Sequence, residues 1–173
     1  MKTNAENHTL SPNFDPLYMA DRKLDLVGLV PTYTMPRIRN AVISMQPAVT
    51  VHLHFSRENF VYCTVDGDMM CTLRLRCERC LGEVEAILNP IVKLIMKPEF
   101  ENITEKIGEY DLYEYSGNGL ELSNLVEDEL LLTLPIALKH KDISLCNSDM
   151  VAWLASGREP GNNKETPFAI LKC

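Results

Sequence analysis

The amino-acid sequence predicts an α+β fold, in which an antiparallel β meander precedes a C-terminal amphipathic helix and short helices flank the sheet. Apolar and polar residues alternate through the middle of the chain, as they do in strands with one buried face. Residues 122–133 then carry apolar side chains at helical spacing. With 173 residues, of which 46% are hydrophobic and 24% charged, the chain is long enough for one folded domain.

We expect three parts along the chain. Residues 1–12 are predicted to form a flexible N-terminal arm, residues 13–156 a single α+β domain, and residues 157–173 an extended C-terminal tail. No signal peptide is expected at the N-terminus, and the longest apolar run is too short to cross a bilayer. These features predict a cytoplasmic protein without membrane association.

The first predicted elements are short. A helix is predicted over Asp15–Arg22, because Pro16 suits its first turn and Asp15 can cap it. Leu24–Val30 alternates as a strand does, and a second short helix is predicted over Pro36–Val42.

The meander is predicted from five apolar runs. They cover Ala48–Phe55, Phe60–Val65, Met69–Arg76, Val84–Met96 and Tyr110–Tyr115. Asp66 and Gly67 separate the second run from the third, either as a two-residue hairpin turn or as a bulge in one long strand. Together the runs indicate an antiparallel sheet with polar residues on its open face.

The amphipathic helix is defined by residues that recur every three or four positions. These residues are Leu122, Leu125, Val126, Glu129, Leu130 and Thr133. Pro135 ends the helix, and a further short helix is predicted over Asp149–Ala155. Because Glu129 falls on the apolar stripe, it is a candidate for a buried ion pair with an arginine.

The chain is acidic, with a net charge of −7. A protein that coats RNA normally carries a basic patch that neutralises phosphates, whereas the Lys and Arg residues are scattered here. Their densest group, Arg74, Arg76 and Arg79, is a candidate for a small RNA contact through phosphates. The charge therefore argues against broad nucleic-acid binding and favours a partner that is itself basic.

Cys77 and Cys80 form a Cys-x-x-Cys motif at the end of a predicted strand. With His140 and Cys146 they give a Cys3His set, one of the combinations that hold zinc in a closed tetrahedral site. The alternative is structural, namely half-buried cysteines and an exposed loop histidine. A thioredoxin-like redox pair is disfavoured, because such a motif opens a helix whereas this one closes a strand.

Glu127, Asp128 and Glu129 form an acidic triplet on the amphipathic helix. Adjacent helical side chains point in different directions, so a solvated or partner-facing surface is a better interpretation than a catalytic site. His52 and His54 share one strand face and are a candidate metal pair, although solvent exposure is the simpler explanation. The sequence shows no phosphate-binding glycine loop and no nucleophile–base arrangement, and it gives no support for an enzyme.

Two blocks of the sequence resemble a known family. Residues 75–81, Leu-Arg-Cys-Glu-Arg-Cys-Leu, resemble the Cys-x-Arg-Cys-Leu block of the YceD family, the large ribosomal RNA subunit accumulation proteins. Residues 125–135, with their Val-Glu-Asp-Glu run and Leu-Pro ending, are similar to the family's second block, which His140 and Cys146 follow. The tail at Pro167–Leu171 also resembles the family's. Most of the chain is therefore covered by the resemblance.

The resemblance implies a role in the synthesis, processing or accumulation of large-subunit (23S) ribosomal RNA in bacteria and plastids, and it brings no catalytic residues. A large-subunit ribosomal protein or a pre-ribosomal particle is the implied partner, with rRNA as a further one. The chain departs from the family pattern at Leu138, where relatives often carry a second proline. Without that proline, the loop that carries His140 is expected to be less rigid.

We therefore expect a non-enzymatic ribosome biogenesis factor. Its docking surface for a partner is predicted at Glu127, Asp128 and Glu129. The alternative is a small zinc- or thiol-dependent protein that binds RNA directly through its arginines.

Overall fold

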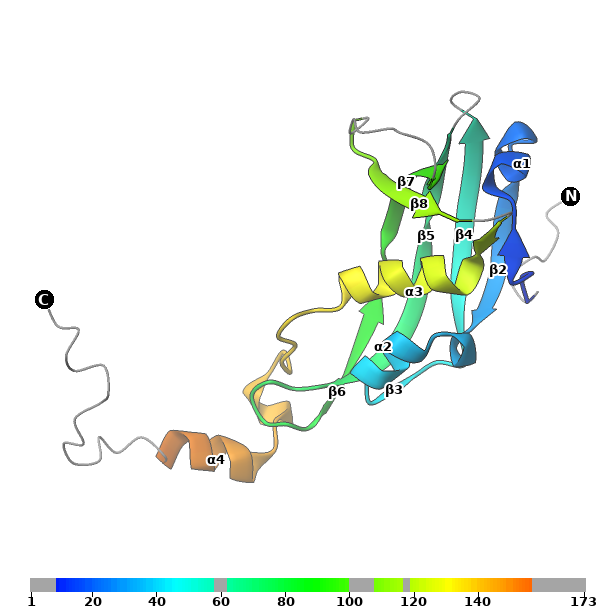
Figure 1. The fold of residues 1–173 in the computed structure, drawn as a ribbon. Coiled ribbons are helices and arrows are strands. Elements are labelled where there is room, and N and C mark those ends of the chain that lie inside the picture. The colour runs from blue at the N-terminus through cyan, green and yellow to red at the C-terminus, as the bar shows by residue number, and fades with distance from the viewer. Residues whose placement is uncertain (1–8, 58–61, 100–107, 117–118, 157–173) are drawn as a thin grey trace, which may run out of the picture. The chain divides into compact units, whose positions relative to one another are not determined.

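The computed structural model describes residues 9–57, 62–99, 108–116 and 119–156 (Figure 1). The chain groups into two compact units. We call Met1–Leu75 with Glu85–Ile136 the sheet unit, and Arg76–Val84 with Ala137–Cys173 the cysteine unit. The predicted tail and most of the predicted N-terminal arm lie outside the described residues.

The sheet unit is built on a seven-stranded sheet. Five strands follow one another across it in the order β2 (Asp25–Pro31), β4 (Ala48–Arg57), β5 (Cys63–Arg76), β7 (Ile91–Pro98) and β8 (Asp111–Tyr115). Two further strands, β3 (Ser44–Met45) and β6 (Glu83–Leu88), pair with β5. The pairs β2–β4, β4–β5 and β5–β7 are antiparallel, whereas β7 and β8 are parallel. Strands and helices together confirm the predicted α+β class.

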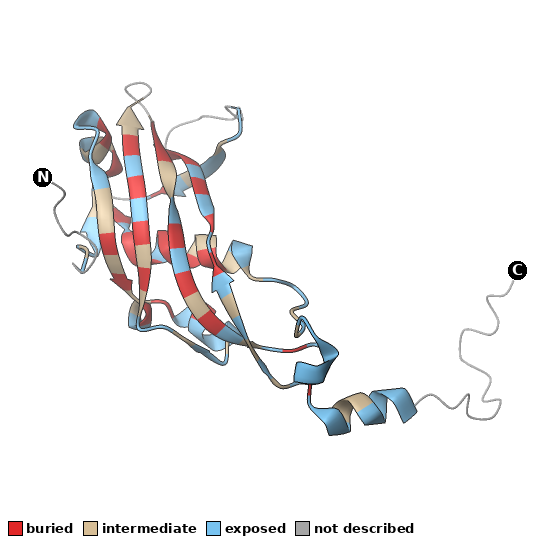
Figure 2. Ribbon diagram, turned by 180° about the vertical axis from the view of Figure 1, so that it is seen from behind, coloured by how far each residue is buried: buried red, intermediate tan, exposed pale blue. Residues whose placement is uncertain are grey.

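The predicted alternation of buried and exposed residues is present along the central strands (Figure 2). In β4, every second side chain from Val49 to Phe55 is fully buried, while His52 and His54 between them are exposed. Burial of one face and solvation of the other is the usual state of an antiparallel sheet.

Three details of the sheet differ from the prediction. Residues 63–76 form one strand, whose pairing with β4 continues through Gly67 without a register shift, so this position is neither a hairpin turn nor a bulge. The run predicted over Val84–Met96 is interrupted before Pro90, which has no N–H for a ladder, and becomes β6 and β7. The twelve residues between β7 and β8 are enough for a crossover, and β8 is parallel to its neighbour rather than antiparallel.

Position 67 of the long strand requires glycine, because the backbone of the neighbouring strand β4 passes too close for any side chain. It lies opposite Leu53 of β4 and Val92 of β7. A Cβ at this position would overlap the backbone carbonyl of His52, which cannot move unless β4 shifts. A glycine in a strand often marks such a close backbone approach.

We expect Gly67→Ala to lower the free energy of unfolding by about 2–4 kcal/mol, because β4 or β5 must shift to admit the methyl group. Urea denaturation followed by circular dichroism measures this change. Asp68→Ala, at the next and exposed position of the same strand, is the matched control and should change stability by less than about 1 kcal/mol. Equal losses in the two variants would contradict the steric explanation.

Three helices belong to the sheet unit, namely α1 (Pro16–Asp21), α2 (Pro36–Ala41) and α3 (Leu122–Thr133). The predicted cap of α1 is confirmed, since the side chain of Asp15 accepts a hydrogen bond from the backbone N–H of Leu17 at 2.9 Å. A short 3-10 turn, η1 (Thr32–Thr34), precedes α2. The short strand β9 (Leu120–Glu121) leads directly into α3 and pairs with β1 (Asn13–Phe14).

Helix α3 lies across one face of the sheet (Figure 1). Its apolar side chains Leu122, Leu125, Val126 and Leu130 are buried and belong to the same core as the inward residues of β4 and β5. This packing, rather than helix propensity alone, stabilises a twelve-residue helix.

The cysteine unit contains η2 (Ile143–Leu145) and α4 (Ser148–Ser156), which confirms the helix predicted over Asp149–Ala155. Met150 and Val151 of α4 pack against a small cluster of buried cysteines. In the described part of the chain, none of the helices is both long and apolar enough to span a membrane.

Candidate functional site

Four side chains of the cysteine unit converge on one point. Cys77 and Cys80 come from the turn after β5, and His140 and Cys146 come from the segment that leads to α4. Their three sulfur atoms and one imidazole nitrogen all lie within 4.8 Å of one another. The Nδ1 atom of His140 is 3.5 Å from the sulfur of Cys80 and 3.5 Å from that of Cys146. The structure therefore brings together all four residues of the predicted Cys3His set.

Backbone hydrogen bonds hold the turn that carries the first two cysteines. The N–H of Cys77 donates to the carbonyl of Gly82 at 2.8 Å, and the N–H of Leu81 donates back to the carbonyl of Cys77 at 2.9 Å. Leu81 adopts a left-handed conformation, with φ of 59°, that closes the turn. A further bond of 2.9 Å, from the N–H of Glu78 to the carbonyl of Leu138, joins this turn to the segment before His140.

The histidine is oriented by its second ring nitrogen. Its Nε2 lies 3.0 Å from the carbonyl oxygen of Glu83, which can only accept a hydrogen bond. In the neutral ring this contact places the proton on Nε2 and leaves the lone pair of Nδ1 facing the sulfurs. Histidine ligands of metals are commonly oriented in this way by a backbone carbonyl. His140 is thus a half-buried, fixed side chain rather than the exposed loop histidine of the alternative interpretation.

Hydrogen-bond donors surround the sulfur of Cys77. Burial by itself would raise the pKa of Cys77, but backbone N–H groups of His140, Cys80 and Arg79 lower it to about 6. The N–H of Arg79 is 3.4 Å from this sulfur. The backbone N–H of Asn147 lowers the pKa of Cys80 in the same way. These donors favour the thiolate, which is the form of cysteine that binds metals.

Cysteines in the core of the sheet unit behave in the opposite way. Burial raises the pKa of Cys63 to about 12 and also raises the pKa of Cys71. Both are fully buried apolar side chains with the thiol protonated near neutral pH. The five cysteines that the structure describes therefore lie in two environments: Cys63 and Cys71 in the apolar core of the sheet unit, and Cys77, Cys80 and Cys146 in the convergent set, where burial and the neighbouring thiols raise the pKa of Cys146.

The arrangement can hold a metal ion with four protein ligands. Three thiolates and one imidazole are a known tetrahedral set, and the spacing of the four atoms suits a metal–sulfur distance near 2.3 Å. Four protein ligands leave no open position for water or substrate, so the chemistry of such a site is structural rather than catalytic. Among the residues that the structure describes, this is the one group of three or more His, Cys, Asp or Glu side chains placed to surround an ion.

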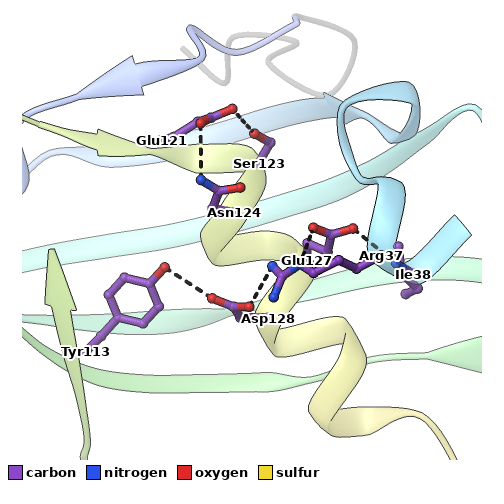
Figure 3. Close-up of polar contacts among 8 residues, drawn as sticks. All are labelled: Arg37, Ile38, Tyr113, Glu121, Ser123, Asn124, Glu127 and Asp128. Carbon is purple, nitrogen blue, oxygen red and sulfur yellow. Dashed lines mark hydrogen bonds and ion pairs between the residues drawn. The ribbon is translucent and has the colours of Figure 1, made fainter. Parts of the chain in front are cut away.

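The acidic triplet divides between the interior and the surface. Glu127 is 1% exposed, and its two carboxylate oxygens contact α2: Oε2 lies 2.8 Å from Nε of Arg37, and Oε1 accepts the N–H of Ile38 at 3.0 Å (Figure 3). The N-cap residue of α2, Met35, offers no capping side chain, so Glu127 serves as acceptor for that helix from a distant part of the chain.

The buried ion pair was predicted at Glu129, and this residue assignment is wrong. Glu127 forms the pair instead, because α3 is rotated so that Ser123, Glu127 and Leu130 face inward. Asp128 also contacts Arg37, with 2.7 Å between Oδ1 and Nη2, and accepts the hydroxyl of Tyr113 at 3.3 Å. Asp128 and Glu129 are half-buried, and docking through the triplet stays a prediction.

The three arginines suggested for RNA contact have different surroundings. Arg74 and Arg76 are exposed on β5. Arg79 is half-buried in the cysteine turn, and its Nη1 lies 3.9 Å from the sulfur of Cys146. Arg79 therefore also contacts the convergent set, and RNA contact by the three stays a prediction.

Among the described residues, His52 and His54 do not belong to a group of three or more potential metal ligands. Each approaches an aspartate on a neighbouring strand, with Nδ1 of His54 2.6 Å from Asp25 and Nδ1 of His52 3.8 Å from Asp68. Both rings are exposed, as the simpler explanation predicted.

Glu129 lies in unfavourable surroundings for a charged carboxylate. Burial raises the pKa of Glu129, and the carboxylates of Asp111 and Asp128 raise it further. Since the pKa is raised in the folded state, Glu129 contributes stability below its unfolded-state pKa and loses that contribution as the pH rises through the folded-state value. At neutral pH its charge therefore disfavours folding.

We expect Glu129→Gln to raise the free energy of unfolding near neutral pH by up to about 1 kcal/mol, a small effect because the side chain is half-exposed. Urea unfolding at about pH 7 and about pH 4 measures the gain, which should shrink at the lower pH. Glu85→Gln, at an exposed position of β6, is the control and should have little effect at either pH. Destabilisation by Glu129→Gln would contradict this account.

Fold and site together define a small α+β protein with a closed Cys/His site that is suited to a structural metal. A family model described as "Large ribosomal RNA subunit accumulation protein YceD" matches residues 65–173, and the chain belongs to this family. A protein of the same name from Haemophilus influenzae is 26% identical over 164 residues, which cover 91% of each chain. No solved structure is significantly similar. The resemblance seen in the sequence blocks is thereby confirmed.

Proposed function

We propose that this protein is a non-enzymatic ribosome biogenesis factor that promotes the synthesis, processing or accumulation of large-subunit (23S) ribosomal RNA in the cytoplasm. The observation that carries the proposal is the family match, which includes both the convergent Cys/His residues and helix α3. The name of the Haemophilus influenzae relative, which describes large-subunit rRNA accumulation, supports the same role.

The distribution of charge supports action through proteins rather than through coating of RNA. The cysteine unit holds seven of the chain's seventeen Lys and Arg residues and six of its twenty-four Asp and Glu residues. The sheet unit therefore holds ten basic and eighteen acidic residues. The negative charge thus belongs to the sheet unit, which would repel phosphates and attract basic surfaces. A large-subunit ribosomal protein or a pre-ribosomal particle fits as partner.

Deletion of the gene tests the proposed function. We expect a lower ratio of 23S to 16S rRNA in the deletion strain, with precursor 23S species visible by primer extension, and restoration by the wild-type gene on a plasmid. The ratio of 16S rRNA to an unrelated stable RNA serves as the control. An unchanged 23S to 16S ratio in the deletion strain would contradict the role.

We further propose that Cys77, Cys80, His140 and Cys146 hold one structural zinc ion. The support is the donor set, the mutual distances, the N–H groups around the sulfurs and the oriented imidazole. A zinc ion bound there would stabilise a unit whose buried apolar residues are few, namely the three cysteines themselves with partly buried Val84, Met150 and Val151.

A further inference from the structure

A groove opens on the sheet unit between β8 and the outer side of α3. Its volume is about 460 Å³, and its lining residues are Leu94, Asp111, Leu112, Tyr113, Asp128, Glu129, Leu131 and Leu132. Half of the lining residues are leucines, and two of these are open to solvent, since Leu132 is 82% exposed and Leu112 is 43% exposed. Apolar side chains at the surface of a groove mark a place where another molecule can exclude water.

The same groove carries one carboxylate, that of Glu129, that no described residue of the protein neutralises. Arg37 and Tyr113 both contact Asp128. In the part of the chain that the structure describes, no hydrogen bond or ion pair reaches the carboxylate of Glu129, although Asp111 and Asp128 are close enough to disfavour its charge. A cationic group in the groove would relieve this repulsion, because opposite charges attract most strongly where water is partly excluded.

We propose that this groove binds a basic, amphipathic segment of a partner protein, with a lysine or arginine against Glu129 and an apolar side chain between Leu112 and Leu132. The inference rests on the proposed function, to which it adds the docking surface and the chemistry of the partner. Leucine walls without cationic side chains exclude a phosphate backbone as occupant, since phosphates need cations to neutralise them. An acidic groove on an acidic unit also selects a basic segment over a second copy of this chain.

Binding of a defined probe to the full-length protein tests the groove. The probe is a short synthetic peptide with repeated Lys-Leu pairs, compared by calorimetry with a peptide in which serine replaces each leucine. We expect Glu129→Gln and Leu132→Ser each to weaken binding of the Lys-Leu peptide by about five- to tenfold. Glu85→Gln and Ile91→Ser, at exposed positions of β6 and β7, are the matched controls and should stay within about twofold.

Carbodiimide cross-linking to purified large-subunit ribosomal proteins locates the contact, because this reagent joins carboxylates to lysine amines within direct reach. We expect cross-links from Glu129 to lysines of one such protein, and their loss in Glu129→Gln. Unfolding does not explain a loss of binding, because Glu129→Gln is expected to stabilise the protein and Leu132 is largely exposed.

Several outcomes would contradict the proposed binding of a basic segment in the groove. Equal losses in Glu129→Gln and Glu85→Gln would mean unspecific attraction by net charge, and equal binding of the Lys-Ser peptide would remove the role of the leucines. Dimerisation that Leu132→Ser abolishes, or RNA binding that it weakens, would assign a different occupant. A normal 23S to 16S ratio after gene deletion would remove the proposed function but leave peptide binding intact, so the two failures are distinguishable.

Discussion

Cys77→Ser should abolish stoichiometric zinc binding and unfold the cysteine unit. One zinc ion per chain is expected in the wild-type protein by elemental analysis, and less than about one tenth of that in the variant, because a hydroxyl is a poor substitute for a thiolate ligand. Apparent binding energies of structural zinc sites are about 10–16 kcal/mol, larger than a unit with so small a core can supply by packing. Loss of one ligand therefore removes most of what holds residues 76–84 against residues 137–156.

Cys71→Ser is the matched control for the metal site. Cys71 is also fully buried, but it lies in β5 among apolar residues of the sheet unit and outside the convergent set. It should keep one zinc per chain while losing about 1–3 kcal/mol of stability from burial of the hydroxyl. Amide hydrogen exchange would localise the effects, with protection lost in the cysteine unit for Cys77→Ser and for chelator-treated wild-type protein. Metal-free wild-type protein with unchanged exchange would rule out a structural zinc ion.

Glu127→Ala is expected to lower the free energy of unfolding by about 2–4 kcal/mol. The variant leaves the N–H of Ile38 without its acceptor inside the protein and removes the buried partner of Arg37. The loss stays below the largest values for broken buried pairs because the side chain of Arg37 is 52% exposed and can be rehydrated. Glu127→Gln should lose about half as much, since its amide oxygen can still accept the bond from Ile38.

Asp128→Asn is the comparison variant for Glu127, because it removes a negative charge next to Arg37 but leaves the buried carboxylate of Glu127 in place. Asp128 contacts the same arginine but is 35% exposed, so its neutralisation should change stability by less than about 1 kcal/mol. Urea unfolding of the single variants, and of each combined with Arg37→Gln, measures the coupling. We expect strong coupling between Arg37 and Glu127 and weak coupling between Arg37 and Asp128. The opposite order would show that the interior carboxylate is not the one that fastens α3 to α2.

Much of the fold is local in origin and could be predicted. The period of two in β4 and the period of three to four in α3 each indicate an element and its buried face, because burial depends on spacing along one short segment. The cap at Asp15 and the ends at prolines are local for the same reason. Gly67 was predicted as part of a turn or bulge because the carbonyl that forbids its side chain belongs to another strand.

The site divides in the same way between sequence and tertiary structure. Residue types and spacing alone determined that Cys77 and Cys80 were a potential ligand pair, and that His140 and Cys146 could complete it. Only the tertiary structure decided that the four atoms converge and that the ring of His140 faces the sulfurs, because segments sixty residues apart must be brought together by packing. It likewise decided that Glu127 rather than Glu129 enters the interior. Glu127 and Glu129 point to nearly opposite sides of α3, because two positions span about 200° of an α-helix. Which side faces Arg37 is set by the contacts of α3 with α2 and the sheet, and no spacing along one helix contains that information.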